Sequence, residues 1–300
     1  MYKYGDIKIN NPSYADVTNM IVTGNITLYS HHIKENCRAA ATNEEYFKFS
    51  SVTIDGQTGY SIGIKDIYRK EIKGKITIPT MYNNKNILQI GDFLKTSNIT
   101  HIYFLADSKC LSIGDIFVST TSVNKGFRCS DFDSQLKQID LPNSVNKIGT
   151  YAFTDCFNLE SINLPDSIET IGERAFGCTT DGGKISKMKV SISSLPDSLK
   201  TLGAYAFYKG GDNITISQIP DGIEKISNWT FADCPNLRIE EFGVSNSSKL
   251  TTIGTAAFWN SGKNVTYVHI GKNVLFLEVS DSRISTSFYG YGSNGTGNLV

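Results

Sequence analysis

The side chains best suited to chemistry in this chain are its cysteines and histidines, six and four in 300 residues. No two cysteines form the Cys-x-x-Cys pair typical of zinc sites, and no cysteine–histidine spacing indicates zinc. The adjacent His31 and His32 would point to opposite faces of a strand, which argues against a shared metal ion. A nucleophilic serine or cysteine needs a nearby base, and no histidine is placed to supply it. We therefore expect no enzyme activity, no metal and no cofactor.

Two further motifs carry little chemistry. Residues 290–295 (GYGSNG) fit the G-x-G-x-x-G string, but the strand, helix and acidic residue that complete a dinucleotide site do not surround them. We interpret them as a glycine-rich turn or tail. The acidic stretch at residues 131–135 (DFDSQ) lacks the spacing of a calcium loop and predicts a surface loop.

Charge and hydropathy exclude two classes of partner. The 29 basic and 29 acidic residues balance, and no run of Lys or Arg is longer than two. Nucleic acids and anionic membranes bind basic patches, and we expect neither as a partner. No stretch approaches the 18 apolar residues of a membrane-spanning helix, so we expect no membrane insertion within this chain. The first ten residues lack the apolar region of a signal peptide.

Three of the cysteines take their spacing from an internal repeat. The stretch IGTYAF begins at Ile148, and IGERAF begins 23 residues later. The same position recurs at Ile90, Ile113, Ile148, Ile171, Leu202, Ile226 and Ile253. An aromatic residue stands five positions later in five copies, as Phe153, Phe176, Phe207, Phe231 and Phe258. Copies lie 23 to 35 residues apart, and the shorter spacings are those of leucine-rich repeats.

The apolar residues of each repeat predict one short strand and one tight turn. Ile139 and Leu141 precede Pro142 and are two apart, as in a strand whose alternate side chains face opposite sides. Proline then ends the strand because it cannot donate to a ladder. The Ile-Gly-x-x-Ala-Phe segment predicts a tight turn or a single helical turn with Ile, Ala and Phe facing inward. One unit cannot bury its apolar face alone, so the units must stack.

The predicted fold is an α/β solenoid, mostly β. It is a curved, right-handed leucine-rich repeat solenoid with a parallel sheet of about seven or eight strands, about 4.8 Å apart. Residues 46–64 alternate apolar and polar around Asp55-Gly56, which predicts a β-hairpin that caps the N-terminal edge of the sheet. We assign residues 1–75 to a non-repeat segment with this cap, 76–275 to the solenoid, and 276–300 to a partial repeat or tail.

The repeat resembles that of BspA-like leucine-rich repeat proteins. Residues 159–178 (LESINLPDSIETIGERAFGC) are close to that family's consensus, and residues 75–91 (KITIPTMYNNKNILQIG) resemble its usual first repeat. The likeness covers about residues 75–275 and departs from the pattern in the 119–135 insertion and at Gly243 and Gly271, which replace proline. It implies a secreted or surface-bound protein that acts as an adhesin or binding scaffold.

The predicted binding surface is the outward face of the strands. Its candidate residues are His101, Tyr103, Lys137, Asp140, Glu160, Asn163, Tyr267 and His269. Tyrosine suits such a surface because it combines apolar area with a polar tip. We expect a monomer, secreted or on the cell surface, that binds a protein or glycan on a host or neighbouring cell. The alternative is a structural spacer of a larger surface protein, with no ligand of its own.

Two interpretations of the repeat cysteines stay open. Cys156, Cys178 and Cys234 each follow the repeat phenylalanine by two or three residues. In the first interpretation they form a buried column of thiols, since a cysteine outside a disulfide behaves as a small apolar residue. Alternatively, Cys156 and Cys178 form a disulfide between adjacent coils.

Overall fold

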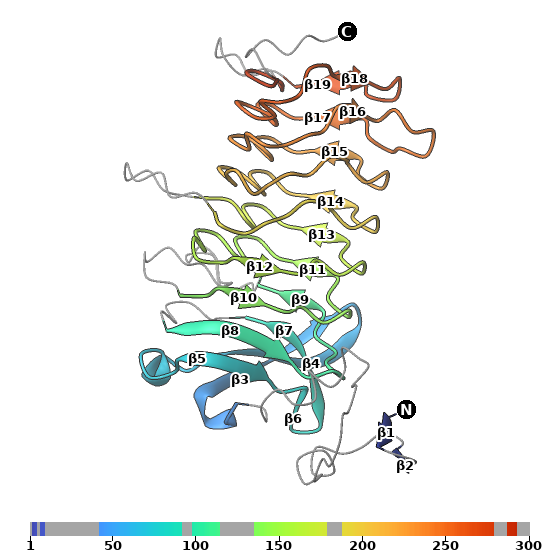
Figure 1. Cartoon of the computed structure of the whole chain (residues 1–300). Helices are drawn as coiled ribbons and strands as arrows, with labels where there is room; N and C mark the ends of the chain where they lie inside the picture. Colours follow the sequence, from blue (N-terminus) through green and yellow to red (C-terminus); the bar gives the residue numbers. More distant parts are fainter. Residues whose placement is uncertain are drawn as a thin grey trace.

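The computed structural model describes residues 2–4, 7–9, 42–91, 98–114, 135–178, 188–278 and 287–292. Over these residues the repeats stack as successive coils of a β-solenoid (Figure 1). Two 3-10 turns, η1 (Glu44–Tyr46) and η2 (Asp66–Tyr68), supply the helical structure of the described chain. β1 (Tyr2–Tyr4) and β2 (Ile7–Ile9) form an antiparallel pair of their own. His31, His32, Cys37, Cys129 and residues 131–134 lie outside the described residues, as do residues 293–295 of the glycine-rich motif.

The predicted hairpin is confirmed, and it begins the longer of two main sheets. β3 (Phe47–Ile54) pairs antiparallel with β4 (Gln57–Ile64). Asp55 and Gly56 between them have φ angles of 49° and 76°, the left-handed conformations of a two-residue hairpin turn. β4 then pairs in parallel with β7 (Lys85–Ile90), onto which β6 (Met81–Tyr82) folds back. The hairpin thus supplies the first two strands of an eleven-stranded sheet, called here the long sheet.

Each later coil adds one two-residue strand to the long sheet. These strands are β9 (Ser112–Ile113), β11 (Lys147–Ile148), β13 (Thr170–Ile171), β14 (Thr201–Leu202), β15 (Lys225–Ile226), β17 (Thr252–Ile253) and β19 (Phe276–Leu277). Six of them end on the Ile or Leu of the repeated Ile-Gly position, so the prediction of a turn at that residue is wrong. Pairing with the strand of the neighbouring coil holds the residue extended, and the turn begins only after it.

A second, shorter sheet follows another side of the coils. The short sheet contains β5 (Gly74–Ile78), β8 (Ile99–Phe104), β10 (Gln138–Ile139) and β12 (Ser161–Ile162), all parallel. β8, β10 and β12 are strands that the apolar pattern predicted. Farther along, β16 (Glu241–Phe242) and β18 (His269–Ile270) form a parallel pair at the same place in the repeat. Turns closed by a proline carbonyl connect the two sides, as where Pro165 O accepts from Ile168 N at 3.1 Å.

A column of stacked phenylalanine rings fills the core. Successive ring centroids lie 5.3 to 5.5 Å apart, and every ring is fully buried. The rings belong to Phe153, Phe176, Phe207, Phe231 and Phe258. This spacing is close to the separation of hydrogen-bonded strands, about 4.8 Å, so each coil places one ring on the ring of the coil before. The inward orientation predicted for the repeat phenylalanine is confirmed.

The glycine of the repeat lets neighbouring coils approach closely. A Cβ atom on Gly203 would lie 2.3 Å from the backbone nitrogen of Glu173 in the preceding coil. One coil carries Ser227 at this position, and its hydroxyl donates to Leu202 O at 2.9 Å. The position therefore selects glycine, or a small residue whose polar group bonds to the coil before it.

Candidate interaction surface

Six of the eight candidate residues lie together, either on β8 or directly beside β10 and β12 of the short sheet. The strand register pairs His101 with Gln138, and Gln138 with Ser161. Ile102 and Ile139 between the candidate positions are buried, so their neighbours along the strands face outward. The set brought together is His101, Tyr103, Lys137, Asp140, Glu160 and Asn163.

Several of these side chains are held by contacts within the sheet. The rings of His101 and Tyr103 stack with centroids 6.1 Å apart and an interplanar angle of 24°. His101 Nδ1 lies 2.8 Å from Thr100 Oγ1. Gln138 Nε2 donates to Asp140 Oδ1 at 2.8 Å. The surface is therefore ordered before any partner arrives, which lowers the entropy lost on binding.

The side chain of Asn163 has a structural role. Its Nδ2 donates to Leu141 O at 2.9 Å, and its Oδ1 accepts from Leu141 N at 2.7 Å. The side-chain amide thus substitutes for a ladder pairing beyond the end of β12. Asn163 is committed to the fold and is a weaker binding candidate than its neighbours.

The surroundings of His101 disfavour its protonation. Partial burial lowers the pKa of its imidazole below the ordinary value, and the positive charges of Lys75 and Lys137 lower it further. The carboxylates of Asp140 and Glu160 act in the opposite direction but are smaller effects. His101 therefore presents a neutral ring at pH 7, able to donate and accept hydrogen bonds.

Tyr267 and His269 do not join this group, because they lie farther along the solenoid. His269 is on β18 and pairs in register with Glu241 of β16. Tyr267 is 46% exposed. A hydrogen bond to Glu240 and the charge of that carboxylate raise the pKa of the Tyr267 phenol.

A groove extends from Tyr267 across the neighbouring coils toward the short sheet. It has a volume of about 870 Å³ and is lined by residues that include Ser193, Ser217, Arg238, Glu240, Glu241 and Tyr267. An adjoining hollow of about 370 Å³ also includes Ser193 in its lining and reaches Ile162 of β12. Both follow the side of the coils that holds the candidate residues.

The sequence contains a pattern that predicts the lining of this groove, but our set of candidate residues did not include that lining. Val190 and Ile192 lie two apart before Pro196, as do Ile214 and Ile216 before Pro220, and all four aliphatic residues are buried. A parallel bridge joins Ile192 to Ile214. The repeat register alone could therefore have added their outward neighbours, such as Ser193 and Ser217, to the predicted binding surface.

Our candidate residues also did not include a ladder of aromatic side chains on the turn side, the side formed by the turns that follow the repeated Ile-Gly position. Tyr205 and Trp229 stack with centroids 6.1 Å apart and planes within 2°, and Trp259 stacks on Tyr289 at 6.5 Å. The guanidinium of Arg174 lies 4.0 Å from the centre of the Tyr205 ring. The signal is the residue three positions after the repeated Ile or Leu, which is aromatic or basic in four copies, as Tyr151, Arg174, Tyr205 and Trp229. The rings use their faces on one another, which leaves mainly their edges for a partner.

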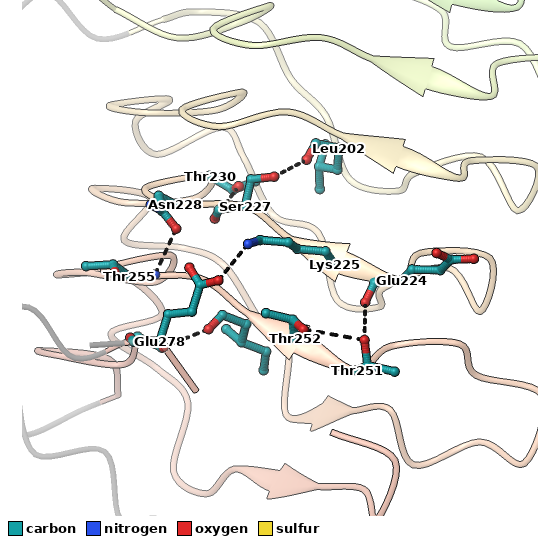
Figure 2. A network of polar contacts seen from close by, with 12 residues as sticks. Leu202, Glu224, Lys225, Ser227, Asn228, Thr230, Thr251, Thr252, Thr255 and Glu278 are labelled. Atoms are coloured by element: carbon teal, nitrogen blue, oxygen red, sulfur yellow. Dashed lines mark hydrogen bonds and ion pairs between the residues drawn. The ribbon is translucent and has the colours of Figure 1, made fainter. Parts of the chain in front are cut away.

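The C-terminal half of the long sheet is occupied by its own polar contacts (Figure 2). Lys225 Nζ lies 2.6 Å from Glu278 Oε1 in an ion pair across the coils. The Oδ1 atom of Asn228 accepts from Thr255 N at 3.0 Å in the next coil. These groups stabilise the stacking of coils and are poor candidates for recognition.

The described cysteines are structural. Cys110, Cys178 and Cys234 are buried thiols, and burial raises the pKa of Cys110 and Cys178 to about 12. Cys156 is in a disulfide, and Cys178 is not its partner, so the bridge considered between them is excluded. Across the described ranges no three His, Cys, Asp or Glu residues gather to hold a metal ion. Nor does any helix in that part of the chain have the length and apolar character of a membrane span.

Comparison with known proteins finds similar solved structures. No curated protein matches the sequence. A leucine-rich repeat protein of T. pallidum is similar over 77% of this chain and 86% of its own, at 17% identity and a TM-score of 0.47. One from Bacteroides ovatus is similar over 78% and 69%, at 18% identity and a TM-score of 0.45. The pneumococcal vaccine antigen PcpA is similar over 79% and 77%, at 19% identity and a TM-score of 0.35.

The family assignment comes from the sequence. The family model for the BspA type leucine rich repeat region matches residues 108–192 and 184–280, in six copies. With this repeat matched over more than half of its length, the chain belongs to the BspA type leucine-rich repeat family.

Proposed function

We propose that this protein is an interaction or adhesion module, secreted or held at the cell surface, that binds a protein or glycan of a host or neighbouring cell. The binding surface is the side of the solenoid that carries the short sheet, the β16–β18 pair and the groove between them. The role is recognition, and the proposal assigns it no reaction.

The observation that carries this proposal is the groove of about 870 Å³ beside Tyr267. The other sides of the described solenoid are less suited to a partner. The turn side uses its aromatic faces internally. The C-terminal half of the long sheet uses its polar groups to join coils.

The charge of the groove favours a basic partner surface. Glu240, Glu241, Asp197 and Asp221 line it with one cation, Arg238. Asp221 accepts hydrogen bonds from the hydroxyl of Ser245, which also lines the groove, and from that of Ser247 nearby. A protein that presents Lys or Arg would find complementary charge here, and Tyr267 offers an aromatic anchor at the edge.

The test is binding of the purified chain to a panel of extracellular proteins, glycans and whole cells. A variant with His101, Tyr103, Tyr267 and His269 all changed to Ala removes the exposed rings of the proposed surface. A control with Thr201→Ala and Thr252→Ala makes small changes on the outer side of the long sheet. Circular dichroism and thermal melting establish that all three proteins are folded.

A drop of at least tenfold in affinity for the quadruple variant, with the control unchanged, supports the proposal. Because the groove is acidic, affinity for a protein partner should also fall as salt is added. Equal binding by all three proteins would move recognition to another side of the solenoid. Binding to nothing in the panel would favour the structural-spacer alternative.

A further inference from the structure

A second cavity lies on the long sheet, away from the surface of the proposed function. Its volume is about 820 Å³, within the range of small-ligand sites. One wall is β3 with the hairpin turn, and the floor is formed by the outer side of β4, β7, β9, β11 and β13. Figure 1 shows the hairpin lying against these first coils. We call this cavity the hairpin cleft.

The strand register explains why polar side chains form the floor. Ser61 pairs with Gln89, and Gln89 pairs with Ser112, so the three occupy one row. The next residue of each strand, such as Ile62 or Ile90, is fully buried in the core. The row must therefore face outward, into the cleft.

This row is far more buried than outward positions farther along the sheet. Ser61, Gln89 and Ser112 are only 4%, 5% and 2% exposed, whereas Thr201 and Lys225 at the same repeat position are exposed. The difference comes from the hairpin, which shields the first strands. The cleft is thus a sheltered polar site rather than an open sheet face.

Ser61 carries the strongest indication of a ligand contact. Its Oγ is the buried side-chain polar atom of the described residues that has no hydrogen-bond partner. The two neighbours in the row are anchored to one backbone carbonyl: Gln89 Nε2 donates to Gly114 O at 2.9 Å, and Ser112 Oγ does so at 3.4 Å. Buried hydroxyls are nearly always satisfied, so an orphan that faces a cavity indicates a group that binds there.

The cleft is held in shape by a contact across the long sheet. Asn146 Nδ2 donates to Asp55 Oδ2 at 3.0 Å, which ties the hairpin tip to a residue 91 positions later. On the rim, the Glu169 carboxylate is fixed by an ion pair to Lys200 at 2.8 Å. The wall and the rim are therefore in place without a ligand.

The chemistry of the lining selects the class of ligand. Hydroxyl groups dominate, from Ser50, Ser51, Thr53, Ser61, Ser112 and Thr170, and each can both donate and accept. The cleft has two carboxylates, Asp55 and Glu169, and one ammonium group, Lys147, so an anion is not favoured. A neutral molecule with several adjacent hydroxyls matches this mixture of donors and acceptors. We propose that the hairpin cleft binds a neutral sugar unit, with Ser61 Oγ bonded to one of its hydroxyls.

The test is titration of the full chain with neutral mono- and disaccharides built from glucose, galactose, mannose and N-acetylglucosamine, by calorimetry and ligand-observed NMR. At least one should bind saturably, and Ser61→Ala should weaken it at least fivefold. Ser61→Ala removes an unsatisfied buried group, so the melting temperature without sugar should stay the same or rise. This pairing of weaker binding with undiminished stability separates a ligand contact from a structural role.

Two controls complete the experiment. Thr201→Ala, at the same repeat position but outside the cleft, should leave sugar affinity unchanged. Asn146→Ala frees the hairpin tip and should weaken binding by a similar factor to Ser61→Ala. No saturable binding of any neutral sugar, or binding that Ser61→Ala does not change, would overturn the proposal. Either result leaves the proposed function untouched, since that surface is tested by different variants.

Discussion

Replacing Phe207 by Ala should remove a large share of the stability of the solenoid. The ring is fully buried and lies between Phe176 and Phe231, with centroids 5.4 and 5.3 Å away and planes within 9° and 2°. Truncation of a buried Phe costs about 3–5 kcal/mol. Two lost aromatic contacts, at about 0.5–1.5 kcal/mol each, place the expected value in the upper part of that range. The free energy of unfolding of natural domains is only about 5–15 kcal/mol, so the effect is easily measured.

The assay is urea unfolding followed by tryptophan fluorescence, since Trp229 and Trp259 lie in the next two coils. Coils of a solenoid contact only their neighbours, so the variant should also broaden or split the transition at the weakened junction. Thr201→Ala, an exposed position in the same coil, is the matched control and should change stability by less than about 0.5 kcal/mol. A loss below about 1 kcal/mol for Phe207→Ala would refute the idea that the ring column holds the coils together.

Three further predictions follow from burial and close contact. Burial raises the thiol pKa of Cys178 and Cys234, so a thiol reagent should label them only after denaturant unfolds the chain; fast labelling of the native protein would contradict this. The pKa of His101 is lowered from 6.5 in the folded state, so the unfolded chain binds the proton more tightly. The free energy of unfolding should therefore decline as pH falls through about 6.5 toward the folded pKa, and His101→Gln should flatten that decline in pH-dependent urea titrations. Gly203→Ala should cost about 1–3 kcal/mol in the same assay, because its Cβ would meet Glu173 N at 2.3 Å; a neutral result would mean that the coils can move apart.

The sequence predicted those features that depend on local chemistry or on the repeat. Asp55-Gly56 specified the hairpin because few residue pairs adopt two consecutive left-handed conformations. The recurring Phe specified the core column because one inward position is repeated in five successive coils. Both signals lie within a few residues of the feature that they predict.

The two-residue strands that the later coils add to the long sheet could not be read from the pattern, and neither could the cleft. A strand such as β14, only two residues long, has no alternation of its own, and only pairing between coils makes it a strand. The cleft depends on how far the hairpin extends over the sheet. That extension is fixed by the hydrogen bond from Asn146 to Asp55, and no local sequence motif predicts this bond.

The backbone of the turns explains why the coils depend on one another. Arg174, Tyr205 and Trp229 all have left-handed φ angles of 50° to 58°, a conformation that costs bulky residues about 1–2 kcal/mol each. Each offsets this cost through its backbone N–H, which donates to a carbonyl of the following coil at 3.0 Å.

These bonds all point toward the C-terminus, so each coil stabilises the turn of the coil before it. At the far end, Ser287 O and Tyr289 O accept from Phe258 N and Asn260 N at 2.9 and 2.8 Å, which extends the same support to the coil of β17. At the N-terminal end the support is different, because β4 of the hairpin pairs with the strand edge of β7. The described coils at the two ends are therefore supported by different contacts, and the N-terminal hairpin lines a polar cleft beside the sheet that it caps.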